Sequence, residues 1–491
     1  MYSEFDSYID DGIGEDREQD TVLDNCFTLF RGKQEARLSV LFILLNLIVV
    51  FVRPQNELGF LSIIKFPFLV SLLPSLMWLM YGVRQKWTPQ MWVMFLFVVQ
   101  GALLVPFATN NRMAFEGFRV LFQLFISVSF PIIVFCRDGF TIRRLWKLFL
   151  FISIYWAFYS FSHSGRGPGD YLGDENDFGL SMLMMLGLIV GGINIFTKRF
   201  YKFLVLCVCV ILICGIIATA SRGAFVGLMC LFAYLVFKSN RKFLVTVLIS
   251  IVFVVGLSLA PKEYVDDMRS ISNTNQGTAK ERREYWKVAW LVFTDFNHII
   301  WGVGMKNLPS RTNEYEPDEN YAPTGRSISG RAAHSLYFTL LPELGLIGLV
   351  LFLCMLWHSF MPNSRYKKNL NVLLTELESL HDSVTTADEL RKRRVYEKTR
   401  LPALADDYFE VIEKLRVEIK MLSMLFLGIN AAWIGVLTSG AFITVLYYPP
   451  IWLLAALSAS AQAYFVKINR FITECEIEVQ SVAGLVDDKD S

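Results

Sequence analysis

Long apolar runs recur along the chain and are separated by short polar segments. A helix needs about 20 predominantly apolar residues to cross the hydrocarbon core of a bilayer, so each such run predicts a membrane span. The runs lie at residues 38–52, 59–81, 91–108, 118–136, 145–162, 178–196, 203–220, 224–237, 243–260, 335–360, 419–437 and 448–466. The shorter ones need flanking residues to complete a crossing. The pattern predicts an all-α integral membrane protein with about twelve transmembrane helices.

The composition agrees with this pattern. Hydrophobic residues make up 54% of the 491-residue chain, and the mean hydropathy is +0.42. The formal net charge of +2 is spread over the loops and gives no reason to expect a nucleic-acid partner. Residues 1–25 are polar and acidic, unlike a cleavable signal peptide, so we expect the first span to target the protein to the membrane.

Basic residues in the short loops predict the orientation. Lysines and arginines gather in alternate loops, at residues 84–86, 137–147, 198–202 and 238–242. Such loops face the cytoplasm, so both termini are expected to be cytoplasmic. The chain then divides into a cytoplasmic N-terminal arm (1–36), transmembrane helices 1–9 (37–260), a large extracytoplasmic loop with an amphipathic helix (261–333), transmembrane helix 10 (334–360), a cytoplasmic helical insertion (361–417), transmembrane helices 11 and 12 (418–466) and a cytoplasmic tail (467–491).

The predicted outer loop contains a helix signal. Thr278-Ala279-Lys280-Glu281 is a capping-box sequence, which is typical of a helix start. Trp286, Trp290 and Phe293 follow at helical spacing, so we expect this face of the helix to lie on the membrane bundle. Trp301-Gly302-Val303-Gly304 is expected to form a tight turn after it. In the insertion 361–417, leucines at helical spacing predict a helical hairpin.

The candidate chemistry lies on the predicted outer side. The sequence has no P-loop, GxSxG elbow or HExxH helix, which argues against an ATP-driven pump, a serine hydrolase and a zincin. It has instead His334 at the edge of an apolar run, Arg222 at the start of another, and Arg282 in the outer loop. Arginine suits phosphate oxygens, and histidine suits removal of a proton from a hydroxyl. The set fits group transfer from a lipid diphosphate to an alcohol, with no metal site.

Each of these residues also has a purely structural explanation. An anchor at the membrane interface, at the start of a span, would explain Arg222 equally well. A helix cap or a contact with a carbonyl would explain His334, and a solvated helix face would explain Arg283. Glu343 is expected about two and a half helical turns beyond His334. A carboxylate inside an apolar run is costly and therefore a functional candidate, although packing against another helix would also account for it.

Three motifs follow one another between residues 219 and 349. They are Thr219-Ala220-Ser221-Arg222-Gly223-Ala224 with Gly227-Leu228, then Arg282-Arg283-Glu284-Tyr285-Trp286 with Asp295 and Gly302-Val303-Gly304, then His334-Ser335-Leu336-Tyr337 with Glu343, Gly345 and Gly348. The ordered set resembles the O-antigen ligase and O-antigen polymerase family. Asp174-Glu175-Asn176-Asp177-Phe178 also resembles the family's acidic, asparagine-containing start of an earlier span.

The resemblance implies a multipass, metal-independent glycosyltransferase of GT-C-like architecture in a bacterial cytoplasmic (inner) membrane. Such an enzyme moves a glycan from an undecaprenyl-diphosphate carrier to a sugar hydroxyl of a glycan or lipid-linked acceptor, during polymerisation or ligation of O-antigen, capsule or exopolysaccharide. No cofactor is implied; the partners are membrane lipids and other polysaccharide-assembly proteins. By motif, the catalytic residues would be His334, Arg222 and Arg282, and the substrate-binding residues would be Asn176, Arg283, Arg331 and Glu343.

A secondary transporter or flippase is the alternative, because about twelve helices is also typical of transporters. Many transporters contain inverted repeats and broken helices at the membrane midplane. No repeat relates the two halves of this sequence, and its candidate residues gather at the predicted outer surface. The sequence therefore favours the transferase. It does not separate a polymerase from a ligase, since the two share one chemistry.

Overall fold

The computed structural model describes residues 34–81, 87–258, 278–316, 330–393 and 401–487. Within these ranges every regular element is a helix. The predicted N-terminal arm 1–36 lies almost wholly outside the described residues, as do residues 261–277 and 317–329 of the predicted outer loop. The basic residue Arg394 of the insertion also lies outside them.

Helices coincide with all twelve apolar runs, because each run satisfies its backbone internally only as a helix. They are α3 (Gln34–Phe51), α5 (Gly59–Ile63) with α6 (Phe66–Tyr81), α7 (Pro89–Leu104), α8 (Asn111–Leu124) with α9 (Phe130–Phe135), α10 (Gly139–Ser162), α11 (Glu175–Gly191), α12 (Arg199–Ala218), α13 (Arg222–Lys238), α14 (Lys242–Ser258), α18 (Tyr337–Arg393), α19 (Leu401–Gly440) and α20 (Pro449–Asp487). Two further helices, α16 (Thr278–Thr294) and α17 (Leu308–Tyr315), belong to the predicted outer loop.

Eight helices in the described ranges are long and apolar enough to cross a membrane. They are Pro89–Phe107, Asn111–Phe135, Gly139–Ser162, Glu175–Ile195, Arg199–Ala218, Tyr337–Ser379, Phe409–Gly440 and Pro449–Cys475. The prediction of an all-α, multipass membrane protein is thereby confirmed. The other four runs correspond to the shorter helices Arg37–Phe51, Phe66–Met77 and Lys242–Ile251 and to the 17-residue α13. The count of about twelve spans and the GT-C-like architecture stay predictions.

Small residues bring the two central helices α11 and α19 together. A Cβ atom on Gly428 of α19 would lie 2.4 Å from the Cα atom of Gly191 in α11. One on Gly187 would lie 2.6 Å from the Cα atom of Ala432. Close backbone approach through small residues is a usual way for helices to associate in a membrane. Helix α19 also packs against α13, α18 and α20, and α11 also packs against α10, α12 and α13.

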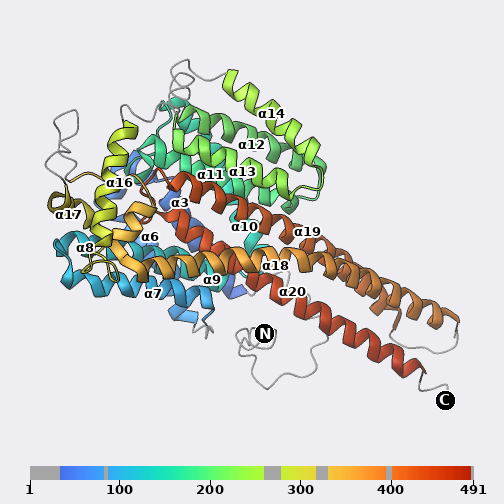
Figure 1. The fold of residues 1–491 in the computed structure, drawn as a ribbon. Coiled ribbons are helices and arrows are strands. Elements are labelled where there is room, and N and C mark those ends of the chain that lie inside the picture. Colours follow the sequence, from blue (N-terminus) through green and yellow to red (C-terminus); the bar gives the residue numbers. More distant parts are fainter. Residues whose placement is uncertain (1–33, 82–86, 259–277, 317–329, 394–400, 488–491) are drawn as a thin grey trace.

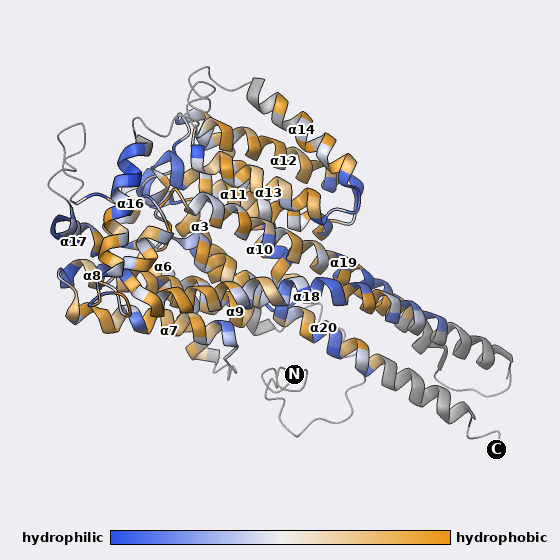
Figure 2. Cartoon of the chain, in the orientation of Figure 1, coloured by the Kyte–Doolittle hydropathy of each residue, from blue (hydrophilic) through white to orange (hydrophobic). Residues whose placement is uncertain are grey.

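The bundle has two different ends. Helices α16 and α17 lie together at one end, and the distal parts of α18, α19 and α20 project from the opposite end (Figure 1). The bundle helices are mostly hydrophobic, whereas hydrophilic residues gather around α16 and α17 and along the projecting arm (Figure 2). In the arm, Leu370, Leu373 and Leu377 of α18 are buried, as is Leu415 of α19. The insertion 361–417 is thus formed by extensions of α18 and α19 beyond their apolar parts.

Helix α18 is interrupted within its apolar part. Gly345 has φ 63° and ψ −161°, a conformation that in practice only glycine adopts. The segment 299–304 packs against this break, and a Cβ atom on Gly345 would lie 2.4 Å from the carbonyl oxygen of Ile300. The helix begins only at Tyr337, so the helical path expected from His334 to Glu343 is wrong in its first turn. The break lies beyond this stretch, two residues after Glu343.

Candidate active site

The starts of three helices lie at the end of the bundle that carries α16. Asp174 caps α11, because its Oδ1 atom accepts hydrogen bonds from the backbone N–H groups of Asn176 (2.8 Å) and Asp177 (3.4 Å). Ser221 caps α13, and its Oγ atom accepts from the N–H of Ala224 at 3.2 Å. Helix α18 begins nearby at Tyr337. Helix N-termini carry partial positive charge and unpaired N–H groups, so this end of the bundle favours an anion.

A hydrogen bond joins the starts of α11 and α13. The Oγ atom of Ser221 donates to Oδ1 of Asn176 at 2.8 Å. This bond fixes the orientation of the Asn176 amide. Arg222, the next residue after Ser221, is half-buried at the first position of α13. The bond therefore brings the sequence-predicted Asn176 close to the sequence-predicted Arg222.

Helix α16 lies at this end of the bundle (Figure 1). Its Arg282 interacts electrostatically with Arg222 of α13. The buried face of α16 is formed by Tyr285, Val288, Ala289 and Val292. Burial lowers the pKa of the Arg282 guanidinium, the positive charge of Arg222 lowers it further, and the negative charge of Asp174 opposes the shift. These interactions mean that Arg282 lies within electrostatic range of both residues.

The tryptophans of α16 meet the sequence prediction only in part. The Trp286 ring is stacked on Phe338 of α18, with centroids 5.1 Å apart and planes 9° apart. Its Nε1–H donates to the carbonyl of Ala333 at 2.9 Å. Phe293 is also buried, but Trp290 is exposed. The expectation that Trp290 faces the bundle is wrong. The adjacent Ala289 belongs to the buried face of α16, and Trp290 points away from it.

His334 lies in the segment 330–336, which leads into α18. Its φ is 46°, and the loop is held by the hydrogen bond from Trp286 to the neighbouring Ala333. Burial lowers the pKa of the His334 imidazole, the positive charge of Arg282 lowers it further, and Asp174 opposes the shift. Ser335 caps α18, because its Oγ atom accepts from the N–H of Phe338 at 3.4 Å. Because Ser335 already caps α18, His334 is not needed as the helix cap.

Glu343 is buried and its carboxylate is fully engaged. Its Oε2 atom accepts from the backbone N–H of Lys306 at 2.8 Å and from the hydroxyl of Tyr447, and Oε1 accepts from the N–H of Leu308 at 3.4 Å. Burial raises the pKa of the Tyr447 phenol well above its ordinary value, and the charge of Glu343 raises it further. The phenol therefore stays protonated and donates this hydrogen bond. These bonds fasten the start of α17 to α18 and to the turn before α20. We therefore assign Glu343 a positioning role in place of the expected substrate contact.

The two other predicted arginines occupy the rim of this region. Arg331 forms an ion pair with Glu281 of α16, with Nη1 and Oε2 3.3 Å apart. Arg283 is exposed on α16, next to Arg282.

Tyr447 was not identified from the sequence. Its signal was weak, because a tyrosine before a proline pair is equally at home at a membrane interface.

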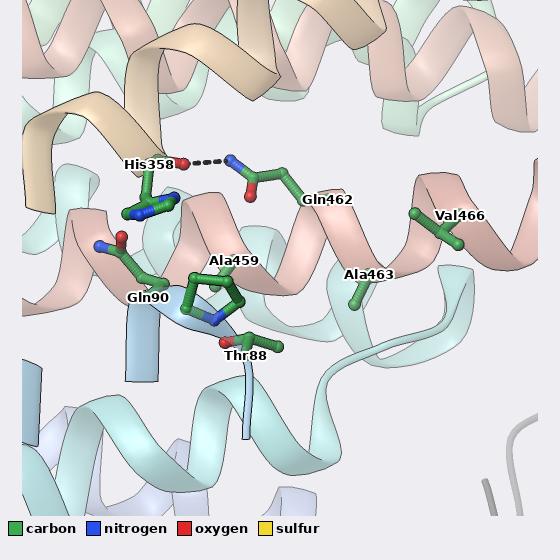
Figure 3. Close-up of a pocket in the computed structure, with 8 residues that line it drawn as sticks. Thr88, Gln90, His358, Ala459, Gln462, Ala463 and Val466 are labelled. Atoms are coloured by element: carbon green, nitrogen blue, oxygen red, sulfur yellow. Dashed lines mark hydrogen bonds between the residues drawn. The ribbon is translucent and has the colours of Figure 1, made fainter. Parts of the chain in front are cut away.

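A small cavity lies elsewhere, between α7, α18 and α20 (Figure 3). His358, Gln90 and Gln462 line it, and the Nε2–H of Gln462 donates to the carbonyl of His358 at 2.9 Å. It contains none of the motif residues. Within the described ranges, no three His, Cys, Asp or Glu side chains lie close enough together to hold a metal ion.

Comparison with known proteins gives one family. Residues 207–353 match the family model described as O-Antigen ligase. The matched part begins in α12, ends in α18 and includes Arg222, Arg282 and His334. No curated protein gives a significant match to the chain.

Proposed function

Because residues 207–353 match the family model described as O-Antigen ligase, we propose that the chain is a membrane glycosyltransferase of surface-polysaccharide assembly. It moves a glycan from an undecaprenyl-diphosphate carrier to a sugar hydroxyl of an acceptor, on the outer face of the bacterial cytoplasmic membrane. The reaction needs no metal ion. The family match also favours a transferase over the transporter alternative.

The observation that carries this proposal is the meeting of three distant motifs. Arg282 of α16 interacts electrostatically with Arg222 of α13 and with His334 of the loop before α18. Two half-buried arginines with mutually unfavourable charges form a site that gains stability when an anion binds. A lipid diphosphate supplies that anion while its tails remain in the bilayer.

The arginines act on the charge that develops during transfer. The acceptor oxygen forms a bond to the anomeric carbon as the bond from that carbon to the diphosphate oxygen breaks. The bonding electrons leave with undecaprenyl diphosphate, so negative charge grows next to Arg222 and Arg282. Donors fixed at this place stabilise the transition state more than the ground state. Losing one such donor raises the barrier by about 3 kcal/mol.

His334 takes the proton of the acceptor hydroxyl. Its pKa is lowered by burial and by Arg282, so the imidazole is neutral at pH 7 and able to accept a proton. Arg282 thus has two roles: it holds the diphosphate and keeps His334 in its basic form. Asn176 and Arg283 lie next to these residues and are proposed to contact the donor, as is Arg331.

The test is removal of the gene, with the surface glycan examined on gels and the carrier lipid by mass spectrometry. Loss of a polymerase leaves single repeat units on the normal acceptor, and loss of a ligase leaves complete chains on the carrier. Either result supports the proposal. An unchanged glycan with altered uptake of a small solute would overturn it in favour of a transporter.

A further inference from the structure

A group of large apolar side chains outside the spans is exposed. Trp290 and Leu291 lie at the C-terminal end of α16, and Phe296, Ile300 and Trp301 lie in the turn that follows, where Phe296 is 92% exposed. We call these five residues the apolar wedge. Exposed large apolar side chains that lie so close together in the chain indicate an interaction site.

Two polar side chains of the same turn face α17. Oδ2 of Asp295 accepts from the hydroxyl of Tyr315, and the His298 ring lies against the same tyrosine, with centroids 6.5 Å apart. Asn297, between them in the chain, is exposed beside Phe296. Asp295 and His298 are thus engaged by the protein, whereas the large apolar side chains of the turn are left uncovered in the described residues.

Pairing with α18 sets the depth of this turn. The N–H groups of Leu346 and Ile347 donate to the carbonyls of Ile299 (2.9 Å) and Ile300 (3.2 Å). Leu346 and Ile347 lie directly after the break at Gly345, inside the candidate span Tyr337–Ser379. Irregular backbone is tolerated at membrane depth where other protein groups satisfy it, and the broken helix does so here.

Met305 gives a second, independent measure of depth. It is fully buried between α7 and α8. A Cβ atom on Gly101 would lie 2.2 Å from its Cε atom, and one on Gly117 would lie 2.7 Å from its Cβ atom. Gly101 and Gly117 lie about 9 Å from the adjoining ends of their spans at 1.5 Å per residue. The loop that carries Met305 therefore inserts between α7, α8 and α18 instead of lying above the ends of these helices.

The apolar wedge continues a lipid-facing surface. Leu346, Val350, Leu353 and Trp357 are exposed at helical spacing along α18, which is the pattern of a span that faces acyl chains. Through the backbone pairing with α18, Ile300 adjoins Leu346 at the top of this stripe.

We propose that the apolar wedge re-enters the leaflet on the side of the candidate active site and contacts the acyl chains of bilayer lipid there. Trp290 and Trp301 suit the interface level, where amphipathic indole rings are enriched. The contact fixes the depth of α16, and with it the depth of Arg282, relative to the headgroups. This inference concerns bilayer lipid and is independent of the proposed transfer reaction.

Nitroxide scanning tests the proposal. Single cysteines replace Phe296, Ile300, Lys287 and Val350 in full-length protein whose eight native cysteines have been substituted. Each protein is spin-labelled and reconstituted in phosphatidylethanolamine–phosphatidylglycerol vesicles, and collisions with oxygen and with an aqueous nickel chelate are measured. Lys287 lies on the polar face of α16, and Val350 on the lipid-facing stripe, so they are the matched controls.

Labels at 296 and 300 are expected to behave like the label at 350, with several-fold higher accessibility to oxygen than to nickel, and unlike the label at 287. Nickel accessibility equal to that at 287 would overturn the proposal. So would low accessibility to both reagents, which would mean that a protein surface covers the wedge.

A second measurement avoids the label. In vesicles with brominated acyl chains, Trp301→Phe should reduce the fluorescence that the lipid quenches, whereas Trp286→Phe should not, because Trp286 is stacked on Phe338. An unchanged quenched fraction in Trp301→Phe would likewise overturn the proposal.

Discussion

The neighbours of His334 control its proton. Removing a nearby positive charge favours the protonated imidazole, so Arg282→Gln should raise the pKa of His334 from its lowered value. The pKa is measured by NMR titration of isotopically labelled histidine; the chain has five histidines, and His334→Gln assigns the signal. Arg283→Gln is the matched control, because Arg283 is adjacent but exposed. Equal pKa values in the two variants would contradict the proposed proximity of Arg282 and His334.

The bond from Tyr447 to Glu343 holds the outer loop in place. Tyr447→Phe leaves a buried carboxylate with one donor fewer, which should lower the free energy of unfolding by about 1.5–3 kcal/mol. Tyr337→Phe is the control, because the Tyr337 hydroxyl bonds to the carbonyl of Leu437 (2.9 Å) at an exposed site. Thermal unfolding in detergent compares them. A loss in Tyr447→Phe no larger than in Tyr337→Phe would refute the positioning role of this pair.

The sequence identified the residues of the proposed charged centre but not the residues that support them. Arg222, Arg282 and His334 were identifiable because charged residues beside apolar runs are rare and costly. Tyr447 was not identifiable, because its role depends on Glu343, which becomes its neighbour only through the packing of α18 against the turn before α20. The assignment of Glu343 to substrate binding followed from its motif alone, and the burial of its carboxylate argues for positioning instead.

At the level of elements, the break in α18 requires a glycine at position 345. Gly345→Ala adds a Cβ atom 2.4 Å from the carbonyl oxygen of Ile300, in a conformation that alanine does not adopt. We expect a loss of at least about 3 kcal/mol of stability, the combined cost of strain and overpacking. Gly330→Ala is the control, since φ is also positive there but no atom lies within 4 Å.

Thermal unfolding and limited proteolysis of the segment 299–304 report the outcome for Gly345→Ala. Loosening of the segment 299–304 should appear as new cleavage in Gly345→Ala and not in Gly330→Ala. Similar stability and similar cleavage in both variants would mean that the break tolerates a side chain, and the interlocked geometry would be wrong.

The positions of the helices were readable from the sequence, but their interruptions were not. Apolar runs predicted each span because hydrophobic length decides it locally. The break at Gly345 depends on the segment 299–304, which is remote in sequence, and a glycine in an apolar run is equally typical of close helix packing. The same limit explains Trp290, since a single helical stripe does not reveal which side meets the bundle.

For the whole molecule, the basic loops predict the orientation in the membrane. In protein without native cysteines, single cysteines at Ser272 and Ser310 should react with an impermeant thiol reagent in intact cells. A cysteine at Ser383 should react only after permeabilisation. The reverse pattern would place the candidate active site on the cytoplasmic side and contradict the proposed reaction on the outer face.

The most direct test of the proposed transferase compares His334→Ala with Arg222→Lys in purified, reconstituted protein. Transfer from an undecaprenyl-diphosphate glycan is measured in excess chelator, together with binding of the same donor and thermal stability. His334→Ala should lose transfer by at least about 100-fold, the usual contribution of a general base, and still bind the donor. Arg222→Lys keeps the charge without the bidentate fork, so binding and turnover should both fall. Near wild-type transfer by stable His334→Ala protein would contradict the account.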